Sequence, residues 1–185
     1  MGFLFGTGDN GKSQLFGSSQ RTSKSACNFE ALGDLDELMS SLGVCRASAE
    51  NLKEDDIVKW VRIIQEKLFI IQVEIATGDP SKKTKILQPQ AVKELERIIN
   101  YVENDVGEIK SFIIPGNDIL ASFLDYSRAL ARRTERRVIL LKESGKRDVS
   151  QSALAYLNRL SSCLFMLARF VQKKHNIPEE HPKYE

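Results

Sequence analysis

The sequence predicts an all-α protein, a bundle of about five helices that follows an N-terminal loop. In five separate stretches, apolar residues recur at alternating spacings of three and four, which places each set on one stripe of a helix. Turn-forming residues separate the stretches, and neither a convincing strand pattern nor an internal repeat interrupts them. The 185 residues are enough to bury one full core, so we expect a single domain over residues 1–185.

The helical bundle is expected to occupy residues 28–172. Residues 1–27 lack helical periodicity and are rich in Gly, Ser, Thr and Asn, which is typical of an ordered or semi-ordered loop. Stripes with this spacing suit helices that pack nearly antiparallel, at about 20°. The five apolar stripes run from Ala31 to Cys45, from Ile57 to Ile75, from Leu95 to Ile109, from Leu124 to Leu141, and from Leu157 to Val171.

The predicted helix ends agree with the turn residues and capping residues. The turn Gly-Asp-Pro-Ser at residues 78–81 ends the second helix. Asn117 or Asp118 can cap the start of the fourth helix, and Ser150 can cap the start of the fifth. Residues 173–185 contain two prolines and many charges, so we expect this polar tail to fray.

The composition argues against several classes of protein. The net charge is +2 at pH 7, so the basicity is local and binding to nucleic acid is not expected. The three cysteines, Cys27, Cys45 and Cys163, are far apart and form no CxxC pair, which indicates a reducing cytosol and no zinc site. The only histidines, His175 and His181, lie in the polar tail, which argues against a histidine-dependent triad or a multi-histidine metal site in the core.

The hydropathy pattern argues against a membrane protein. No apolar run is long enough to span a bilayer, because Gln72 and Glu74 interrupt the strongest one. The N-terminus lacks a charged start followed by an apolar segment, so we expect no secretory signal. We therefore expect a cytoplasmic protein with no membrane partner.

Residues 127–137 contain five arginines and one glutamate within a stretch that otherwise has the pattern of a core helix. On a helix, Arg128, Arg132 and Glu135 fall within an arc of about 60°, one turn above the next. Guanidinium groups beside a core cost free energy unless an anion meets them. The missing negative charge is either a carboxylate of another subunit or a ligand such as a polyphosphate.

Two other interpretations of the arginine helix remain open. The arginines can form a solvated basic face, although Ala129, Leu130 and Ala131 between them make full solvation less favourable. They can also form a structural network of ion pairs. The candidate partners of these arginines are Asp34, Asp36 and Glu37 of the first predicted helix, within one chain or between chains.

Residues 6–13, with the sequence Gly-Thr-Gly-Asp-Asn-Gly-Lys-Ser, match the P-loop pattern G-x4-G-K-[ST]. A P-loop NTPase fold needs a buried strand before this loop and a parallel sheet to hold it, and neither is expected here. The glycines still allow backbone N–H groups to converge on an anion, and Lys12 and Ser13 add a charge and a hydroxyl. A phosphate-binding loop and a plain flexible terminus both fit the pattern.

Two further residues have alternative interpretations. Asn158 interrupts the apolar fifth helix, where an interior Asn can fix the helix register or can bind a ribose or an amide. Phe112 leads into the turn before the arginine helix, and packing in the core is the default expectation for such a residue.

Taken together, these stretches resemble the PduO-type ATP:cob(I)alamin adenosyltransferases, also called corrinoid adenosyltransferases. The resemblance runs from about residue 7 to about residue 170, and the arginine helix and the Tyr-Leu-Asn-Arg-Leu-Ser stretch at 156–161 are its most specific parts. The matching stretches are residues 7–11, 30–38, 68–69, 74–77, 112–116, 127–137, 156–161 and 164–165.

The resemblance implies a homotrimer of five-helix bundles with active sites between subunits. Family members bind ATP with the N-terminal loop and the arginine helix, use a divalent cation, usually Mg²⁺, and transfer the 5′-deoxyadenosyl group to Co(I) of a corrinoid, with release of triphosphate. Co(I) is itself the nucleophile, so the protein's task is to orient C5′ and to stabilise charge on the leaving group. A corrinoid reductase or an adenosylcobalamin-dependent enzyme is an implied partner.

The resemblance also implies roles for individual residues, and no protein ligand for a metal is assigned. Arg132 would contact phosphates, and Glu135 and Asn158 would help to place the nucleotide. Arg128 would pair with Asp36 across the subunit interface, Arg136 would join the ligand-binding residues, and Phe112 would lie beneath the corrin. The loop residues that would wrap the triphosphate are Thr7, Gly8, Asp9, Gly11 and Ser13, and Lys12 lies beside Gly11 in the same loop.

The chain departs from the family pattern at several positions. Phe5 and Gly6 stand where the family usually has Thr followed by a basic residue, so we expect Lys12 to supply the missing charge. Met39, Gln72 and Asn117 also differ from the usual residues. A non-catalytic relative that binds nucleotide or corrinoid is therefore the alternative function, and an all-α interaction protein without a small ligand is a third.

Overall fold

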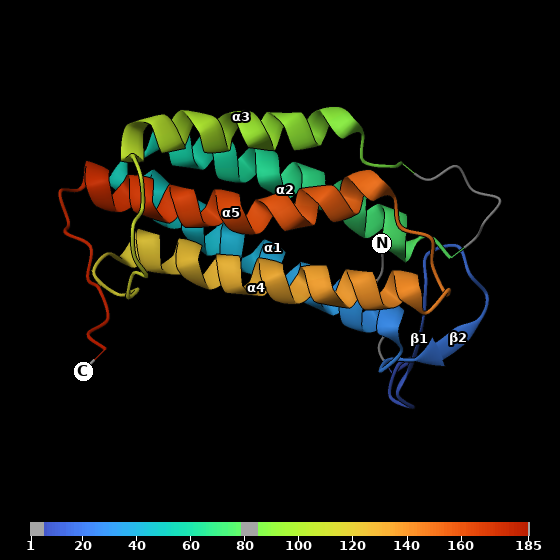
Figure 1. The fold of residues 1–185 in the computed structure, drawn as a ribbon. Helices are drawn as coiled ribbons and strands as arrows, with labels where there is room; N and C mark the ends of the chain where they lie inside the picture. The colour runs from blue at the N-terminus through green and yellow to red at the C-terminus, as the bar shows by residue number, and fades with distance from the viewer. Residues whose placement is uncertain (1–5, 79–84, 185) are drawn as a thin grey trace.

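The computed structural model describes residues 6–78 and 85–184, which form a bundle of five helices and a short β-hairpin (Figure 1). Consecutive helices run in opposite directions along the bundle. The all-α class and the five-helix count are thus confirmed for the described residues. The elements are β1 (Lys12–Gln14), β2 (Arg21–Ser23), α1 (Cys27–Leu52), α2 (Asp55–Ala76), α3 (Pro89–Val106), α4 (Ile119–Glu143) and α5 (Gln151–Lys174).

The helices are arranged as a ring around one core. Helix α4 packs against α1 and α5, α1 also packs against α2, α5 also packs against α3, and a weaker contact between α2 and α3 closes the ring. The predicted stripes supply the core, and Ala31, Leu68, Leu124 and Leu164 are among its fully buried residues. No helix of the described residues is long and apolar enough to cross a membrane.

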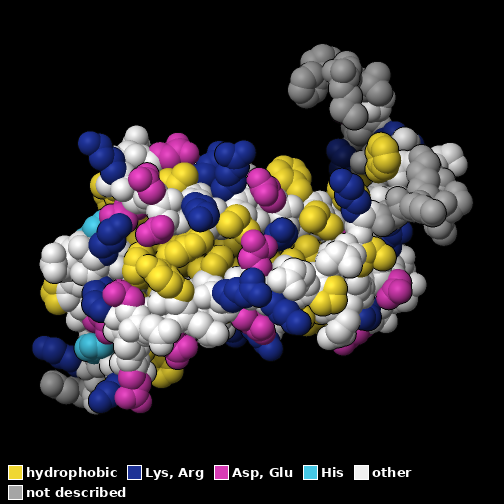
Figure 2. Space-filling view, turned by 90° about the horizontal axis from the view of Figure 1, so that it is seen from above, with side chains coloured by type: hydrophobic (Ala, Val, Ile, Leu, Met, Phe, Trp, Pro, Cys, Tyr) yellow, Lys and Arg dark blue, Asp and Glu magenta, His cyan; other side chains and the backbone are white. Residues whose placement is uncertain are grey.

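Charged side chains of both signs cover much of the surface, in agreement with the small net charge. Figure 2 shows the face seen from above in Figure 1, where hydrophobic side chains gather near the middle and charged ones surround them. The surface is therefore not uniformly basic on this face.

Two of the predicted helix caps are present. The Asp118 carboxylate accepts a hydrogen bond from the Ala121 N–H at 2.7 Å at the start of α4. The Ser150 hydroxyl accepts one from the Ala153 N–H at 3.2 Å at the start of α5. These bonds satisfy N–H groups that have no partner within the helix. Of the predicted turn after the second helix, residues 79–81 lie outside the described residues.

The expectation of no strand was wrong for the N-terminal segment. Strands β1 and β2 pair antiparallel, with Lys12 opposite Ser23 and Gln14 opposite Arg21. Each strand has only three residues and is mostly exposed, so no apolar alternation marks it in the sequence.

The hairpin is attached to the end of the bundle at which α2 and α4 finish. The Phe16 N–H donates to the Ala76 carbonyl at 2.9 Å, and the Gly78 N–H donates to the Phe16 carbonyl at 2.8 Å. A Cβ atom on Gly78 would lie 2.9 Å from the Leu15 Cβ, so only glycine allows this close approach. The Phe112 loop lies at the other end, between α3 and α4 (Figure 1).

The expectation that residues 173–185 fray was wrong for the described part of this tail. Helix α5 continues to Lys174, and the chain beyond it follows the loop before α4. The Ile114 N–H donates to the Glu180 carbonyl at 2.8 Å, and the Asn117 amide donates to the Pro178 carbonyl at 3.3 Å. Backbone pairing of this kind does not require apolar side chains, so composition alone did not reveal it.

Candidate functional site

The arginines of α4 divide into two groups. Arg133 and Arg137 face α1: the Arg133 Nε lies 3.4 Å from an Asp34 oxygen and its Nη2 contacts Glu37, while the Arg137 Nη2 lies 3.5 Å from a Glu30 oxygen. This group forms the structural network of ion pairs that was one of the interpretations of the sequence.

The second group, Arg128, Arg132 and Arg136, turns away from α1. Arg132 and Arg136 are exposed, and neither has a carboxylate within ion-pair distance among the described residues. The Arg136 side chain donates to the Arg132 carbonyl at 3.1 Å. Because a guanidinium is charged at any physiological pH, these two side chains leave positive charge available for an anion.

A first pocket, of about 380 Å³, lies between α3, α4 and α5 and contains two of these arginines. Its wall is mixed, since cationic, hydroxyl and apolar side chains all contribute. It is lined by Ile99, Glu103, Arg128, Arg132, Ser161, Ser162, Phe165 and Met166.

A second pocket, of about 640 Å³, lies beside the first and shares Arg128 and Phe165 with it. Residues 109–115 of the loop before α4 form one wall, and Tyr184 of the C-terminal tail contributes to the lining. Phe112 is 80% exposed and lines this pocket, so the expectation that it packs in the core was wrong. The two pockets form one groove with a basic half and a larger aromatic half.

A buried ion pair lies where the two pockets meet. The Arg169 guanidinium donates to one oxygen of Asp125, and the Arg128 Nε lies 3.4 Å from the other. The side chains of Arg169 and Asp125 are only 1% and 5% exposed. The Arg169 guanidinium also lies 5.1 Å from the centre of the Phe165 ring. Arg169 thus holds Asp125, which holds Arg128, and supports an aromatic wall of both pockets.

Sequence reasoning did not identify Asp125 or Arg169. A signal was available, because both residues interrupt the apolar stripes of their helices, next to Leu124 and Ala168. A charged residue on a buried stripe requires a partner, although the sequence does not say which one.

The structure brings Glu135 and Asn158 together, as the resemblance implied that they act at one site. The Asn158 side-chain amide donates to the Glu135 carboxylate at 2.9 Å and accepts from Arg159 at 2.7 Å. Asn158 is exposed, so the interpretation of it as an interior residue that fixes the register was wrong. Its polar atoms lie at the surface between α4 and α5.

The loop at residues 6–13 is ordered by its own hydrogen bonds. The N–H groups of Asp9, Gly11 and Lys12 are already bonded within it, to the Gly6 and Gly8 carbonyls and to the Asn10 side chain. Gly11 has a φ of 73°, a left-handed conformation that favours glycine. Thr7 is exposed and Ser13 is half-buried on β1. The loop therefore offers fewer free N–H groups than its glycines suggested.

Two cations that sequence reasoning missed lie against this loop. The Arg21 guanidinium donates to the Thr7 carbonyl and, at 2.7 Å, to the Lys12 carbonyl. The Lys24 Nζ lies so close to Gly8 that a Cβ atom there would be 2.9 Å from it. Both residues follow the hairpin turn, and their spacing in the sequence has no pattern that points to the loop.

Several residues that were expected to act together are not joined within one chain. Among the described residues, no hydrogen bond or ion pair links residues 6–13 to α4. Asp36 is exposed on α1 and has no such link to Arg128, whose printed carboxylate partner is Asp125. A basic loop and a basic groove are thus present at separate places on the chain.

The described residues offer little for nucleophilic or metal chemistry. Burial raises the pKa of the Cys45 thiol to about 11 and that of the Cys163 thiol to about 12, which keeps both protonated and unreactive at neutral pH. No group of three or more His, Cys, Asp or Glu side chains in this part of the chain is arranged to hold a metal ion. The groove supplies cations, polar groups and aromatic walls.

The chain is thus a helical bundle with two adjoining pockets, one that contains arginines and a larger one with aromatic side chains. The chain belongs to the cobalamin adenosyltransferase family, which it matches over residues 3–171. It is 38% identical over 165 residues to the corrinoid adenosyltransferase PduO of Salmonella typhimurium, and the match covers 88% of this chain and 47% of that protein. The chain thus spans about half the length of that relative and of PduO from Citrobacter freundii.

Other relatives match over most of their length. The corrinoid adenosyltransferase of Bacillus subtilis is 34% identical over 172 residues, which cover 92% of this chain and 86% of that protein. The fold is similar to that of a PduO-type ATP:corrinoid adenosyltransferase variant from Lactobacillus reuteri, solved in complex with cobalamin and ATP. The TM-score is 0.86 at 28% identity, with 99% of this chain and 97% of that chain covered.

Proposed function

We propose that this protein transfers the 5′-deoxyadenosyl group of ATP to Co(I) of a corrinoid, forming a Co–C bond and releasing triphosphate. The observation that carries the proposal is the pair of adjoining pockets that share Arg128 and Phe165. The basic pocket suits a nucleotide, and the larger aromatic pocket suits a flat macrocycle. Family membership and the liganded Lactobacillus reuteri structure support the same pairing of substrates.

The chemistry needs no nucleophile from the protein. The electron pair of Co(I) attacks C5′ of ATP and becomes the Co–C bond. The C5′–O bond breaks, and the triphosphate leaves with the electron pair of that broken bond. No proton is transferred in this step. The protein's contribution is to hold C5′ in line with cobalt and to stabilise the charge that develops on the triphosphate oxygen.

Residues of the groove and of the neighbouring α4–α5 surface would divide these tasks. Arg132 and Arg136, which have no carboxylate partner among the described residues, would meet the triphosphate. Glu135 and Asn158 would orient the nucleoside, since they offer an acceptor and a donor at the α4–α5 surface. Phe112 would lie against the corrin and keep one face of cobalt free of a ligand.

Mg²⁺ would enter with the nucleotide. This cation keeps several waters and is usually held by substrate phosphates and one or two carboxylates. That mode fits a chain whose described residues contain no cluster of metal ligands. No residue of this chain is assigned to the ion.

The loop at residues 6–13 would complete the nucleotide site of a neighbouring copy in a homotrimer. Its separation from the groove within one chain supports this arrangement. Arg21 and Lys24 would supply the cations that the family places before its Thr-Gly-Asp sequence, alongside or in place of Lys12. Exposed Asp36 would then be free to pair with the Arg128 of another copy.

The test is an anaerobic assay with chemically reduced cob(I)alamin, ATP and Mg²⁺, followed by absorbance. Loss of the Co(I) band with growth of an adenosylcobalamin spectrum is the expected result. If cobalamin or ATP binds but no conversion follows, the protein is the non-catalytic relative instead. If neither ligand raises the melting temperature, the interaction-protein alternative is favoured, because a ligand of the folded state must stabilise it.

The homotrimer has a separate test. Sedimentation of Asp36→Ala and Arg128→Ala variants is expected to show weaker association than the wild type. Intact trimers in both variants would contradict the assignment of this pair to the interface, and a monomeric wild type would contradict the shared site altogether.

A further inference from the structure

The aromatic pocket is bounded by two segments that are bonded to each other. One is the loop before α4, which carries Phe112, and the other is the tail after α5, which carries Tyr184. The His181 Nδ1 lies 2.9 Å from the Phe112 carbonyl oxygen and 2.8 Å from the Ser111 hydroxyl. Together with the bonds at Ile114 and Asn117, these contacts make the loop and the tail one wall.

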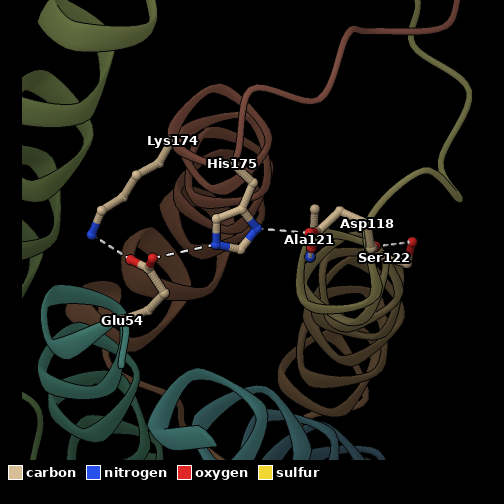
Figure 3. A network of polar contacts seen from close by, with 6 residues as sticks. All are labelled: Glu54, Asp118, Ala121, Ser122, Lys174 and His175. Carbon is tan, nitrogen blue, oxygen red and sulfur yellow. Dashed lines mark hydrogen bonds and ion pairs between the residues drawn. The ribbon is translucent and has the colours of Figure 1, made fainter. Parts of the chain in front are cut away.

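His175 lies where both segments are anchored. It is the C-cap residue of α5, so the tail begins directly after it, and Asn176 turns the chain with a left-handed φ of 55°. Its Nδ1 lies 2.8 Å from a carboxylate oxygen of Asp118, the N-cap residue of α4, at which the loop ends. Its Nε2 lies 3.3 Å from Glu54, just before α2 (Figure 3). One ring therefore joins three helix ends.

The geometry of these contacts requires the charged form of the ring. A carboxylate only accepts hydrogen bonds, and a neutral imidazole has a single N–H to donate. Both contacts are satisfied together only when both ring nitrogens carry protons. The hydrogen bond to Asp118 is the main cause that raises the pKa of His175, and the bond to Glu54 adds to it, against a smaller opposing effect of burial. The ring side chain is 21% exposed, so it can exchange protons with solvent.

The charged groups around the ring come from three elements. Glu54 and Asp118 face it from the α2 and α4 ends. Lys174, next to it on α5, binds the second Glu54 oxygen at 2.5 Å. This hydrogen bond is the main cause that raises the pKa of Lys174, and the charges of Asp55 and Asp56 in the first turn of α2 also raise it. Asp118 uses its other oxygen to cap α4. When the ring loses its proton, a lone pair faces a carboxylate, and one of the two bonds is lost.

We propose that protonated His175 is a positioning residue for corrinoid binding, because it holds the α4 start and the α5 end that anchor the Phe112 loop and the tail. The inference rests on the proposed function for its kinetic readout. The folded-state pKa of His175 lies above the unfolded value of about 6.5. The stabilisation of the folded state by charged His175 is therefore fully present below the unfolded pKa of this residue, and it is lost as pH rises through the folded pKa.

The test compares the KM values for cob(I)alamin and for ATP at pH 6 and pH 9 in the wild type, His175→Gln and Lys174→Met. The wild-type KM for the corrinoid is expected to rise with pH, relative to that of His175→Gln, by about threefold to tenfold, the net worth of one hydrogen bond. The ATP KM ratio of the two proteins is expected to stay constant. Lys174→Met is the matched control, because it removes a cation that binds Glu54 but does not touch Asp118. This variant is expected to keep the wild-type pH profile of the corrinoid KM.

A second measurement separates this inference from the proposed activity. Amide hydrogen exchange of Ala121 and Ile114 is expected to be slower in the wild type than in His175→Gln at pH 6, with the difference gone at pH 9. If His175→Gln folds poorly, Asp118→Asn replaces it in the comparison with the wild type. This variant keeps a capping side chain but removes the charge that faces the ring. The role of His175 would be overturned if the wild type and His175→Gln exchanged at equal rates at both pH values, or if their corrinoid KM values had identical pH profiles. Absence of adenosylation with the exchange difference intact would overturn the proposed function alone.

Discussion

The two sides of α4 use the same residue type for different purposes. On the side that faces α1, Arg133 and Arg137 meet the carboxylates of Glu30, Asp34 and Glu37. On the other side, Arg132 and Arg136 have no carboxylate within ion-pair distance among the described residues. The first pair joins two helices, whereas Arg132 of the second pair lines a pocket and Arg136 is exposed one turn further along α4.

The difference shows how to tell a structural arginine from a ligand-binding one. A neutralised guanidinium at the surface contributes little free energy and no affinity for anions. An unpaired guanidinium beside a pocket attracts a phosphate, because its charge is not already satisfied. Arg128 stands between the two cases, since it shares Asp125 with the buried Arg169.

The largest expected effect comes from removal of the carboxylate that neutralises the buried pair. Asp125→Ala should lower the free energy of unfolding by about 3–5 kcal/mol, because the Arg169 charge is then buried without a partner. Denaturant unfolding at a fixed protein concentration measures this loss. The Asp125→Leu, Arg169→Met double variant should recover most of it, and an Asp125→Ala protein as stable as the wild type would contradict the assignment.

The next largest effect is expected from an arginine that has no partner. Arg132→Ala should lower kcat/KM by about a hundredfold or more, because one group that stabilises the leaving triphosphate is lost. Its unfolding free energy should change by no more than about 0.5 kcal/mol, since the residue is exposed. Steady-state kinetics and thermal unfolding of the same preparation give both numbers. A near-normal rate would rule out its role.

The comparison extends to the cations of the N-terminal loop. Lys24→Ala should raise the Kd for ATP by about tenfold to a hundredfold, the cost of losing one charged hydrogen bond. Both lysines are exposed, but the Lys24 Nζ lies directly against Gly8 of the loop, whereas Lys12 is on β1. Lys12→Ala, measured in parallel by calorimetry, is the matched variant. If only Lys12→Ala weakened ATP binding, the substitute for the missing basic residue would be Lys12, as the sequence suggested.

The smallest effect is expected on the paired side of α4. Arg133→Ala should lower the unfolding free energy by only about 0.2–1 kcal/mol, because Arg133 and Glu37 are 38% and 47% exposed and the less exposed Asp34 keeps Arg137 as a partner. Its kcat/KM should stay close to the wild-type value, in contrast to Arg132→Ala. Loss of activity in a well-folded Arg133→Ala protein would remove the distinction between the two sides.

Much of the fold was predictable because it depends on local chemistry. The apolar stripes placed Leu68 and Leu164 in the core, and the caps at Asp118 and Ser150 follow from side chains that bond the next turn. The hairpin was not predictable, because three-residue exposed strands leave no periodic signal. The tail was misjudged for a related reason, since its bonds involve backbone groups that every residue carries and polar side chains without a periodic pattern.

The candidate site was predictable only in part. The charge excess on residues 127–137 was evident from residue type and spacing, whereas a shared site for Glu135 and Asn158 was implied only by the family resemblance. The partition of the arginines was not, because Arg132 and Arg133 differ by only about 100° around the helix and face different neighbours. The same holds for Arg21 and Lys24, whose contacts with the loop depend on the hairpin.

The sequence by itself determined the helical class, the core stripes and the family, because each depends on residue type at regular spacing along one chain. Only the tertiary structure decided which charges are neutralised. The partners of Asp125, Arg133 and His175 come from helices far away in sequence, and the distance between opposite charges sets their interaction energy. Burial of a few atoms then decides whether a charge holds the bundle together or remains available to a ligand.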